Sequence, residues 1–331
     1  NMNELKKLDF VENKIKTGCK TYLKNNFKNI IPNIIEVYIK FLTNIKKYME
    51  IESSYNVEQK IKANIANLKE QKVEFEDLSA LIYLKSKICG SGEYEKYKHI
   101  AIDEAQDFGD FSFYALKYLL KNSTFSIFGD LAQSIYQYRG IKSWKEVSNN
   151  TFESKCETKY LLKSYRTTTE IMNSANEITN YIKLNTAQPV IRHGKQVNFI
   201  NYNNYIEQID IIKNILNQYK ENEYKTVAII CKDEEDALLI HKELKSENIE
   251  INIITNTDRQ YDGGVCIITS YLAKGLEFDG VIISNASEGK YDSNKNIDMK
   301  LLYVAMTKTL HELNVLYNNN IVKPLKTNVE R

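Results

Sequence analysis

The first quarter of the chain carries apolar residues at three- and four-residue spacing. This spacing places side chains on one face of a helix, and it predicts a helix over residues 30–45 and another after the acidic residues 74–77. The apolar positions of the first helix are Ile30, Ile31, Ile34, Ile35, Tyr38, Phe41, Leu42 and Ile45. Pro32 lies near the helix start, where a proline is tolerated. We expect residues 3 to about 90 to be mainly helical.

The pattern changes near Gly90–Gly92, after which short apolar runs alternate with amphipathic segments. The short runs predict strands at residues 99–102, 125–128, 226–230, 251–254, 265–269 and 281–284, and the amphipathic segments predict helices at 205–219 and 234–245. Alternating strands and helices are typical of parallel sheets with right-handed crossovers. A natural break falls around residues 189–194.

Composition excludes several classes of protein. The 331 residues are 43% hydrophobic, which suits two or three folded domains. No apolar run reaches the length of a membrane span, and five cysteines without a CxxC pair argue against a zinc site or a disulfide framework, so we expect a cytoplasmic protein. The net charge of +2 says little about nucleic acid. Residues 1–98 hold 18 lysines against 13 acids, which fits a solvated helical surface or a nucleic-acid face.

The segment HIAIDEAQD at residues 99–107 is a predicted strand that ends in two adjacent carboxylates, Asp103 and Glu104. Ligands bind at the carboxyl ends of parallel strands, so this pair is expected in a crevice. One carboxylate can hold Mg²⁺, and the other can orient and deprotonate an attacking water. A solvated strand end is the simpler alternative for this segment taken alone.

A second block, GDLAQSIYQYRG at residues 129–140, follows the next predicted strand. Gln133 can hydrogen-bond a phosphate or a water. Tyr136, Tyr138 and Arg139 offer flat surfaces for nucleobases, and such stacking contributes about 1–3 kcal/mol per base. This block therefore combines a phosphate-sensing residue with a candidate nucleic-acid surface.

Three more blocks complete an ordered set: LLKSYRT at 161–167, TSYLAKGLEFDGV at 269–281 and LLYVAMTKT at 301–309. With DEAQD and GDLAQSIYQYRG, they resemble the UvrD/Rep family of superfamily 1 ATP-dependent helicases over roughly residues 95–320. The resemblance implies an α/β fold with two RecA-like parallel-sheet lobes, the first incomplete, and an N-terminal helical subdomain. The expected boundaries are 1–92 for the helical subdomain, 93–192 for the first lobe and 193–331 for the second.

The resemblance also implies roles for individual residues, with ATP and Mg²⁺ as cofactors. Asp103 would serve Mg²⁺, Glu104 would activate water, Gln133 would contact the γ-phosphate, and Arg166 would neutralise the transferring phosphoryl group. Lys308 completes the implied catalytic set as a phosphate contact. The residues implied for ATP binding are Tyr165 on the adenine, Glu277 on the ribose, and Gly275. Those implied for nucleic-acid binding are Tyr136, Tyr138, Arg139, Thr269 and Tyr271. Arginine is scarce in this chain, and two of its five, Arg139 and Arg166, fall inside the blocks.

Two departures from the family pattern matter. The last block ends in Thr307-Lys308 where the family has Thr-Arg. Lysine keeps the positive charge but lacks the two parallel N–H donors of arginine. Two alternatives therefore stay open: Lys308 contacts the phosphate as the arginine would, or it makes a weakened contact. The sequence also contains no GxxxxGK[ST] loop, whose amides and lysine cradle phosphates. We therefore expect a C-terminal fragment of a longer motor that is inactive alone.

Three functions remain open. The leading hypothesis is the motor segment of an ATP-dependent DNA helicase or translocase that tracks single-stranded DNA. Only 103 residues separate Arg166 from Thr269, which resembles the HelD-like branch and suggests a remodelling factor acting on RNA polymerase. The third is a passive nucleic-acid-binding module. Elsewhere, residues 290–295 are expected to form a solvated loop, and Asp233–Asp236 to open a helix.

Overall fold

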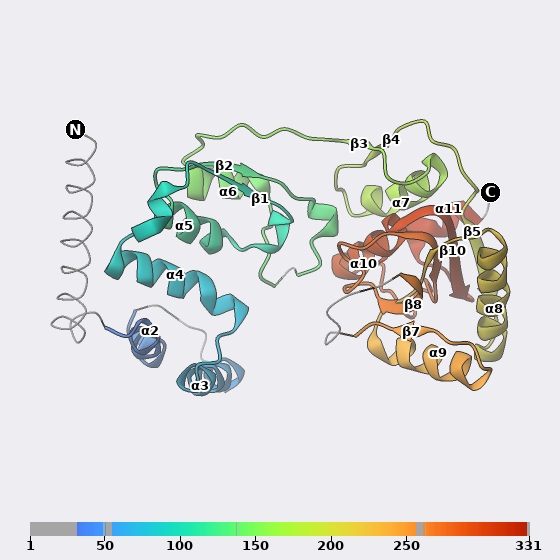
Figure 1. The fold of residues 1–331 in the computed structure, drawn as a ribbon, viewed down its shortest axis with the longest axis horizontal. Helices are drawn as coiled ribbons and strands as arrows, with labels where there is room; N and C mark the ends of the chain where they lie inside the picture. The colour runs from blue at the N-terminus through green and yellow to red at the C-terminus, as the bar shows by residue number, and fades with distance from the viewer. Residues whose placement is uncertain are drawn as a thin grey trace, which may run out of the picture. The chain divides into compact units, whose positions relative to one another are not determined.

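A computed structural model describes residues 32–48, 50, 55–136, 138–255, 261 and 263–329 (Figure 1). The predicted helix positions Ile30 and Ile31, and the rest of the expected helical subdomain before residue 32, lie outside the described residues. The chain divides into two compact units, each described by itself below. The first contains the described residues up to Asp103 with 108–128 and 145–154; the second contains 104–107, 129–144 and the chain from Lys155 onward.

Helices build most of the first unit. They are α2 (Ile34–Thr43), η1 (Ile45–Lys47), α3 (Tyr55–Lys69), α4 (Phe75–Cys89) and η2 (Gly92–Lys96). The α2 helix begins two residues after Pro32, and the Asn33 side chain accepts from the Ile35 amide at 3.0 Å. Buried Asp77 of α4 accepts from the Tyr38 hydroxyl at 2.9 Å and from Asn64 of α3 at 3.0 Å, so it links three helices. Both predicted helices in this region are confirmed within the described residues.

A small parallel sheet completes the first unit. Its strands β1 (His99–Ile102) and β2 (Thr124–Ile127) pair in register from His99 opposite Thr124, and α5 (Asp110–Leu119) connects them. The ring of Tyr83 on α4 packs against Phe111, Tyr114 and Tyr118 of α5, with ring centroids 5.1–5.7 Å apart. Helix α6 (Trp144–Phe152) follows β2 and the 129–140 block. Both predicted strands are confirmed.

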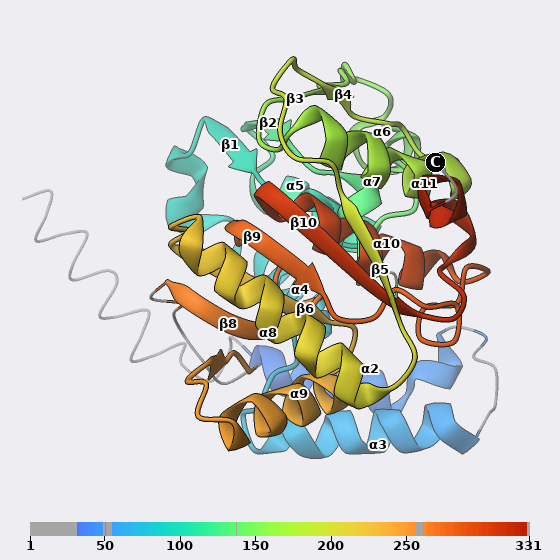
Figure 2. The same cartoon turned by 90° about the vertical axis from the view of Figure 1, so that its right-hand side faces the viewer.

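Six parallel strands form the sheet of the second unit, in the order β5-β10-β9-β6-β8-β7 (Figure 2). They are β5 (Asn198–Tyr202), β6 (Thr226–Cys231), β7 (Asn252–Ile253), β8 (Gly264–Thr269), β9 (Phe278–Ile283) and β10 (Thr309–Asn318). The strands β6 to β9 confirm the predicted ones, whereas β5 and β10 were not predicted. A separate two-stranded parallel sheet joins β3 (Lys163–Ser164) and β4 (Gln188–Pro189).

Helices cover both faces of this sheet. On one face α8 (Tyr205–Glu221) and α9 (Glu234–Ser246) bury Ile212 and Ile240 against the strands. On the other, α7 (Thr169–Tyr181) and α10 (Asn296–Thr307) bury Ile171 and Leu302 (Figure 2). The chain ends in η5 (Lys323–Leu325) and α11 (Lys326–Val329). The predicted α/β class with parallel sheets and the helices α8 and α9 are confirmed.

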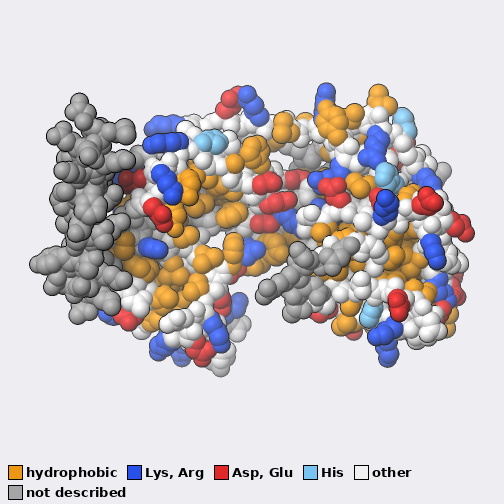
Figure 3. All heavy atoms as spheres, viewed as in Figure 1, with side chains coloured by type: hydrophobic (Ala, Val, Ile, Leu, Met, Phe, Trp, Pro, Cys, Tyr) orange, Lys and Arg blue, Asp and Glu red, His pale blue; other side chains and the backbone are white. Residues whose placement is uncertain are grey.

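The packing of α7 bears on the domain boundaries. Because α7 packs on the six-stranded sheet, residues 155–192 lie in the second unit, whereas the predicted boundary is at 192/193. The division into 1–92, 93–192 and 193–331 stays a prediction. On the face shown in Figure 3, acidic and basic side chains are intermixed with hydrophobic ones. This distribution agrees with the small net charge of the chain.

Candidate functional site

The turn after β1 is held by a buried glutamine. This turn contains η3 (Ala105–Asp107), and Gln106 within it is fully buried. The Gln106 side-chain oxygen accepts from the Asp130 backbone amide at 3.0 Å, and the Gln106 backbone carbonyl accepts from the Ile141 amide at 3.2 Å. Gln106 therefore ties the DEAQD block to both ends of the 129–140 block, which makes one site of two motifs that are separate in sequence.

Glycines begin and end the 129–140 block because a side chain would collide with Gln106. A Cβ on Gly129 would lie 2.4 Å from the Gln106 Oε1, and a Cβ on Gly140 would lie 2.5 Å from the Gln106 carbonyl oxygen. Gly275 is required for a different reason: its φ of +84° lies in the region that only glycine adopts without strain. Glu104 also has a positive φ, of +51°, so the turn holds the backbone of this residue in a conformation that is uncommon for residues other than glycine.

Lys274 lies at the centre of the acidic side chains. It belongs to the turn between β8 and β9, and its Nζ is 2.5 Å from Asp107 Oδ2 and 3.1 Å from Glu104 Oε2. Burial raises the pKa of Glu104, but hydrogen bonds from Gln106 and Lys274 and the charge of Lys308 outweigh it, so that the pKa is below its usual value. Glu104 is therefore an ionised carboxylate at neutral pH, as a general base must be.

Gln133 connects this cluster to Lys308. It lies in η4 (Leu131–Gln133), its side-chain amide donates to Asp130 Oδ2 at 2.9 Å, and its Oε1 accepts from Lys308 Nζ at 3.5 Å. Lys308 is only 1% exposed. Burial and the nearby charge of Arg166 lower the pKa of Lys308. The lysine that replaces the family's arginine therefore faces Gln133 from a buried position.

Arg166 and Glu277 form an ion pair at the edge of the site. The Arg166 Nε is 2.8 Å from Glu277 Oε1, and both side chains are about half exposed. The Arg166 carbonyl accepts from the Arg192 guanidinium at 2.6 Å, which fixes the backbone here. Tyr165, the predicted adenine-stacking residue, is 69% exposed, so its ring is accessible.

The predicted nucleic-acid residues fall into two groups. The Arg139 guanidinium lies 4.4 Å from the Tyr136 ring centroid and 5.7 Å from that of Tyr138, and Tyr138 is 75% exposed. Tyr271 is half-buried in the turn after β8. Thr269, at the end of β8, is buried, and its hydroxyl has no hydrogen-bond partner among the described residues. Contact of these residues with a strand stays a prediction.

Sequence reasoning missed Gln106, Asp107, Asp130 and Lys274 as site residues. All four lie inside the quoted blocks, so their position was the available signal. The structure joins Glu104, Gln133 and Lys308 through contacts with these residues, while Arg166 pairs with Glu277. Asp103 belongs to the first unit.

No three His, Cys, Asp or Glu side chains of the described residues gather as a metal site of protein ligands alone. A Mg²⁺ that arrives with a nucleotide needs only one or two carboxylates, because phosphates and waters supply its other ligands. The site fits this requirement: Asp107 Oδ1 is buried without a hydrogen-bond partner among the described residues, and the Asp107 and Glu104 carboxylates both contact Lys274 Nζ. The predicted Mg²⁺ role of Asp103 stays a prediction.

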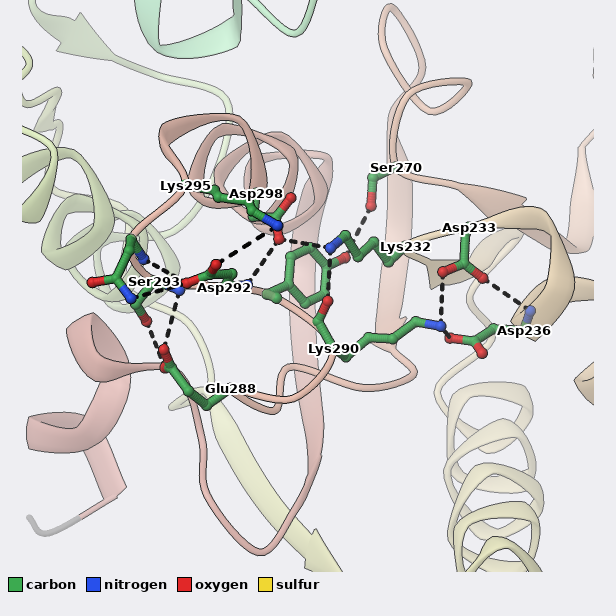
Figure 4. A network of polar contacts seen from close by, with 12 residues as sticks. Lys232, Asp233, Asp236, Ser270, Glu288, Lys290, Asp292, Ser293, Lys295 and Asp298 are labelled. Atoms are coloured by element: carbon green, nitrogen blue, oxygen red, sulfur yellow. Dashed lines mark hydrogen bonds and ion pairs between the residues drawn. The ribbon is translucent and has the colours of Figure 1, made fainter.

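The loop after β9 is a polar network instead of a solvated loop (Figure 4). Lys290 is 22% exposed and lies 2.7 Å from both Asp233 and Asp236, while Lys232 lies 2.6 Å from Asp298. The expectation for residues 290–295 is therefore wrong for its first half: long-range ion pairs draw Lys290 inward. Asp233 does cap α9 as predicted, accepting from the Asp236 amide at 3.2 Å.

This network lies at the carboxyl ends of β6 and β9, the place where ligands commonly bind in a parallel sheet. The connection after β6 leads toward β7 on one side, and the connection after β9 leads toward β10 on the other. Crevices between the carboxyl ends of two such strands usually take ligands. Here the protein's own Lys232, Lys290 and Tyr291 occupy it, with the Lys232 ammonium 5.2 Å from the Tyr291 ring centroid. The cluster around Lys274 is thus the better candidate site.

Parallel sheets that carry the DEAQD, GDLAQ and LAKGLEF blocks define an α/β protein of the helicase class. Three family models match the chain: the UvrD/REP helicase N-terminal domain over residues 3–150, and UvrD-like helicase C-terminal domains over 160–262 and 264–316. The chain belongs to the UvrD/Rep family of helicases, which confirms the resemblance found in the sequence.

Several relatives are similar over parts of the chain. The ATP-dependent DNA helicase Rep of Buchnera aphidicola is 28% identical over 268 residues, which are 72% of this chain and 40% of the relative. DNA helicase II of Haemophilus influenzae is 36% identical over 85 residues, 25% of this chain and 12% of its own. The ATP-dependent DNA helicase PcrA of Staphylococcus epidermidis is 24% identical over 191 residues, 55% of this chain and 26% of its own. The chain thus spans 40% or less of the length of these relatives.

Among solved structures, the C-terminal domain of a possible DNA helicase from Lactobacillus plantarum aligns with a TM-score of 0.42 and 29% identity. The alignment covers 49% of this chain and 92% of that domain. Within the described residues, every helix is too short or too polar to cross a membrane.

Proposed function

We propose that the chain is a motor segment of an ATP-dependent DNA helicase or translocase, with ATP and Mg²⁺ as cofactors. The observation that carries the proposal is the set of contacts through which Lys274 and Gln133 bring Glu104, Asp107 and Lys308 together. The cluster contains a carboxylate base, a glutamine and two ammonium groups. Phosphoryl transfer needs these types of group, because its catalysis rests on positioning and on neutralising charge.

Each residue has a defined part in the proposed reaction. Glu104, kept ionised by its neighbours, accepts a proton from the attacking water. Gln133, held by Asp130 and Lys308, orients that water or a phosphate oxygen. Arg166 leaves Glu277 to neutralise the transferring phosphoryl group, and Glu277 is then available to a ribose hydroxyl. Mg²⁺ supplies further charge neutralisation when it is bound with the nucleotide.

The proposed partner is single-stranded DNA. Exposed Tyr138, with Arg139 next to it, can stack on bases without reading their sequence. The relatives named above are described as DNA helicases, which favours DNA over RNA polymerase as the target. The remodelling alternative rests on sequence spacing alone.

We also propose that the 331-residue chain alone hydrolyses ATP negligibly. Its sequence contains no GxxxxGK[ST] loop, and without those amides and that lysine the β- and γ-phosphates lack their main cradle. Measurable turnover by a homogeneous preparation of this chain would contradict the proposal.

The decisive experiment compares ATP hydrolysis with and without single-stranded DNA, in the helicase of which this chain is proposed to be a segment. Strong stimulation by the strand is expected. Glu104→Gln should lower kcat by about a hundredfold or more and leave nucleotide binding within about threefold, because it removes the base and keeps the size of the side chain. Glu247→Gln, at the exposed C-cap residue that follows α9, is the matched control and should keep parental kcat. Hydrolysis by Glu104→Gln at the parental rate would remove Glu104 from the mechanism.

A further inference from the structure

A second arginine, Arg192, continues the short parallel ladder that leads to Arg166. In this ladder the Val190 amide donates to the Ser164 carbonyl at 3.0 Å. Two residues further along both segments the sheet of β3 and β4 has ended, and Arg192 lies opposite Arg166. Here the donor is a side chain: Arg192 Nη1 donates to the Arg166 carbonyl at 2.6 Å. The Arg192 guanidinium therefore takes the place that a backbone amide has one rung earlier.

Arg192 is itself held from two directions. Its carbonyl accepts from the Thr169 amide at 2.9 Å, at the start of α7, and its Nη2 lies 3.1 Å from Nδ1 of His311 on β10. A guanidinium can only donate, so His311 Nδ1 is the acceptor, and the neutral ring carries its proton on Nε2. That Nε2 is 3.7 Å from Asp279 Oδ1, and the ring is stacked on Tyr224 with centroids 6.0 Å apart. The guanidinium thus has a fixed position relative to the six-stranded sheet.

This contact holds the backbone of Arg166 and leaves the Arg166 guanidinium free. Arg166 Nε is 2.8 Å from Glu277 Oε1, and half of the Arg166 side chain is exposed, so its end can move. A long side chain has many rotamers, and a fixed starting point reduces the number of positions that its end can reach. We infer that Arg192 is a positioning residue for Arg166: it anchors this arginine at the edge of the nucleotide site while the guanidinium exchanges Glu277 for a phosphate.

The inference deepens the proposed function, because it adds a residue that acts on phosphoryl transfer through Arg166. Only its kinetic consequence rests on that function. The hold of Arg192 on Arg166 is a property of the folded chain and can be measured without nucleotide. One test therefore uses the chain alone, and a second uses ATP hydrolysis.

The first test measures the hold on Arg166 in the 331-residue chain by nuclear magnetic resonance. The chain has only five arginines, so its arginine Nε–Hε signals can be assigned by single substitutions. Arg192→Met should speed the exchange of the Arg166 Hε proton with water by about fivefold or more, because a loosened backbone weakens the pairing with Glu277. Arg192→Lys should restore part of the protection, because the ammonium keeps a donor for the Arg166 carbonyl.

Lys225→Met is the matched control for this test. Lys225 lines the same cavity of about 430 Å³ as Arg192 and His311, and its side chain makes no hydrogen bond or ion pair with a described residue. Its loss should leave Arg166 exchange at the parental rate. His311→Phe keeps a ring next to Tyr224 and removes the acceptor of Arg192, so it should speed the exchange by a smaller factor.

Circular dichroism checks that each variant is folded, and His311→Phe carries the test if Arg192→Met is not. Parental exchange of the Arg166 proton in the folded variants would overturn the inference. Equal acceleration in Lys225→Met would overturn it too, because the effect would then come from any lost charge in this cavity.

The second test is kinetic and uses the helicase of which this chain is proposed to be a segment. Arg192→Met should lower kcat for ATP hydrolysis by about tenfold and change KM for ATP by less than about twofold, because Arg166 acts on the transition state. In an Arg166→Ala background the same substitution should cost nothing further, because the residue through which it acts is gone. A loss of kcat by the same factor in both backgrounds would overturn the inference.

The two kinds of failure can be told apart. Absence of DNA-stimulated hydrolysis in the parent would remove the proposed function, and the proton-exchange result would still decide whether Arg192 holds Arg166. Hydrolysis that is stimulated by DNA and unaffected by Arg192→Met would remove the positioning role and leave the proposed function standing.

Discussion

At the residue scale, the site depends on the close approach of two glycines to Gln106. Gln106 is fully buried, and the two glycines of the 129–140 block pack against it where no Cβ fits. Glycine is therefore needed at these two positions because no side chain fits there, and not because the backbone must be flexible. This explains why the 129–140 block begins and ends with glycine.

Gly129→Ala should destabilise the chain by about 1–3 kcal/mol, because the new methyl group would force Gln106 away from the Asp130 amide. Urea denaturation followed by circular dichroism measures the free energy of unfolding. Gly289→Ala is the matched control: its Cβ would meet nothing within 4 Å, so the expected change is within about 0.5 kcal/mol. Equal effects of the two substitutions would contradict the packing argument.

At the element scale, a single carboxylate joins the starts of two neighbouring strands. Asp279 of β9 accepts from the Lys225 amide at 2.8 Å and from the Thr226 amide and hydroxyl at 2.9 and 3.1 Å. Burial raises the pKa of Asp279, but the backbone hydrogen bonds from Thr226 and Lys225 outweigh it and lower the pKa. The first residue of β6 is thereby aligned with β9.

The lowered pKa of Asp279 predicts how the free energy of unfolding depends on pH. A carboxyl whose folded pKa lies below its unfolded value of about 3.9 stabilises the fold above that pH and loses the contribution as the pH falls. Asp279→Asn should cost about 1 kcal/mol at pH 7 and less at pH 3, because the neutral amide keeps one acceptor but no charge. Unfolding free energies at several pH values measure this. Asp210→Asn is the control: it changes an exposed ion pair on α8 and should alter the free energy of unfolding by less than about 0.5 kcal/mol at either pH. A cost of Asp279→Asn that does not depend on pH would refute the argument.

Local pattern predicts some elements of this fold better than others. The strands β6, β8 and β9 are nearly continuous apolar runs, so the sequence predicts them directly. The strand β10 was missed because His311 and Glu312 interrupt its apolar pattern, yet Glu312 is fully buried. Its partners Lys195, Asn222 and Tyr224 come from distant segments, and no local pattern reveals them.

The site shows the same limit. Ordered blocks identify Glu104, Gln133 and Arg166 as candidates, but they do not say which side chains touch. Lys274 meets Asp107 across 167 residues of chain, so its central position could only come from the structure. The network around Lys290 was missed for the same reason, since its partners Asp233 and Asp236 lie at the start of α9, far away in the sequence.

At the scale of the whole molecule, charge gives little help to nucleic-acid binding. The net charge is +2, and Figure 3 shows acidic and basic side chains intermixed over one face. Long-range attraction to a polyanion should therefore be weak, and affinity for single-stranded DNA should depend on a few local contacts. Stacking on exposed Tyr138 beside Arg139 is the main candidate for such a contact.

This argument predicts both a salt dependence and a mutational effect. Each phosphate neutralised on a single strand contributes about −0.7 to the slope of log K against log salt, and we expect a slope shallower than about −2 for this chain. Tyr138→Ala should weaken binding by about 1–3 kcal/mol and leave that slope unchanged, because it removes a flat surface and no charge. Fluorescence anisotropy with a labelled oligothymidine over a range of salt concentrations measures both. Tyr160→Ala, at another exposed tyrosine outside the block, should bind like the parent. A steep slope together with no effect of Tyr138→Ala would mean that lysines hold the strand through its phosphates, and the stacking surface would then have to be abandoned.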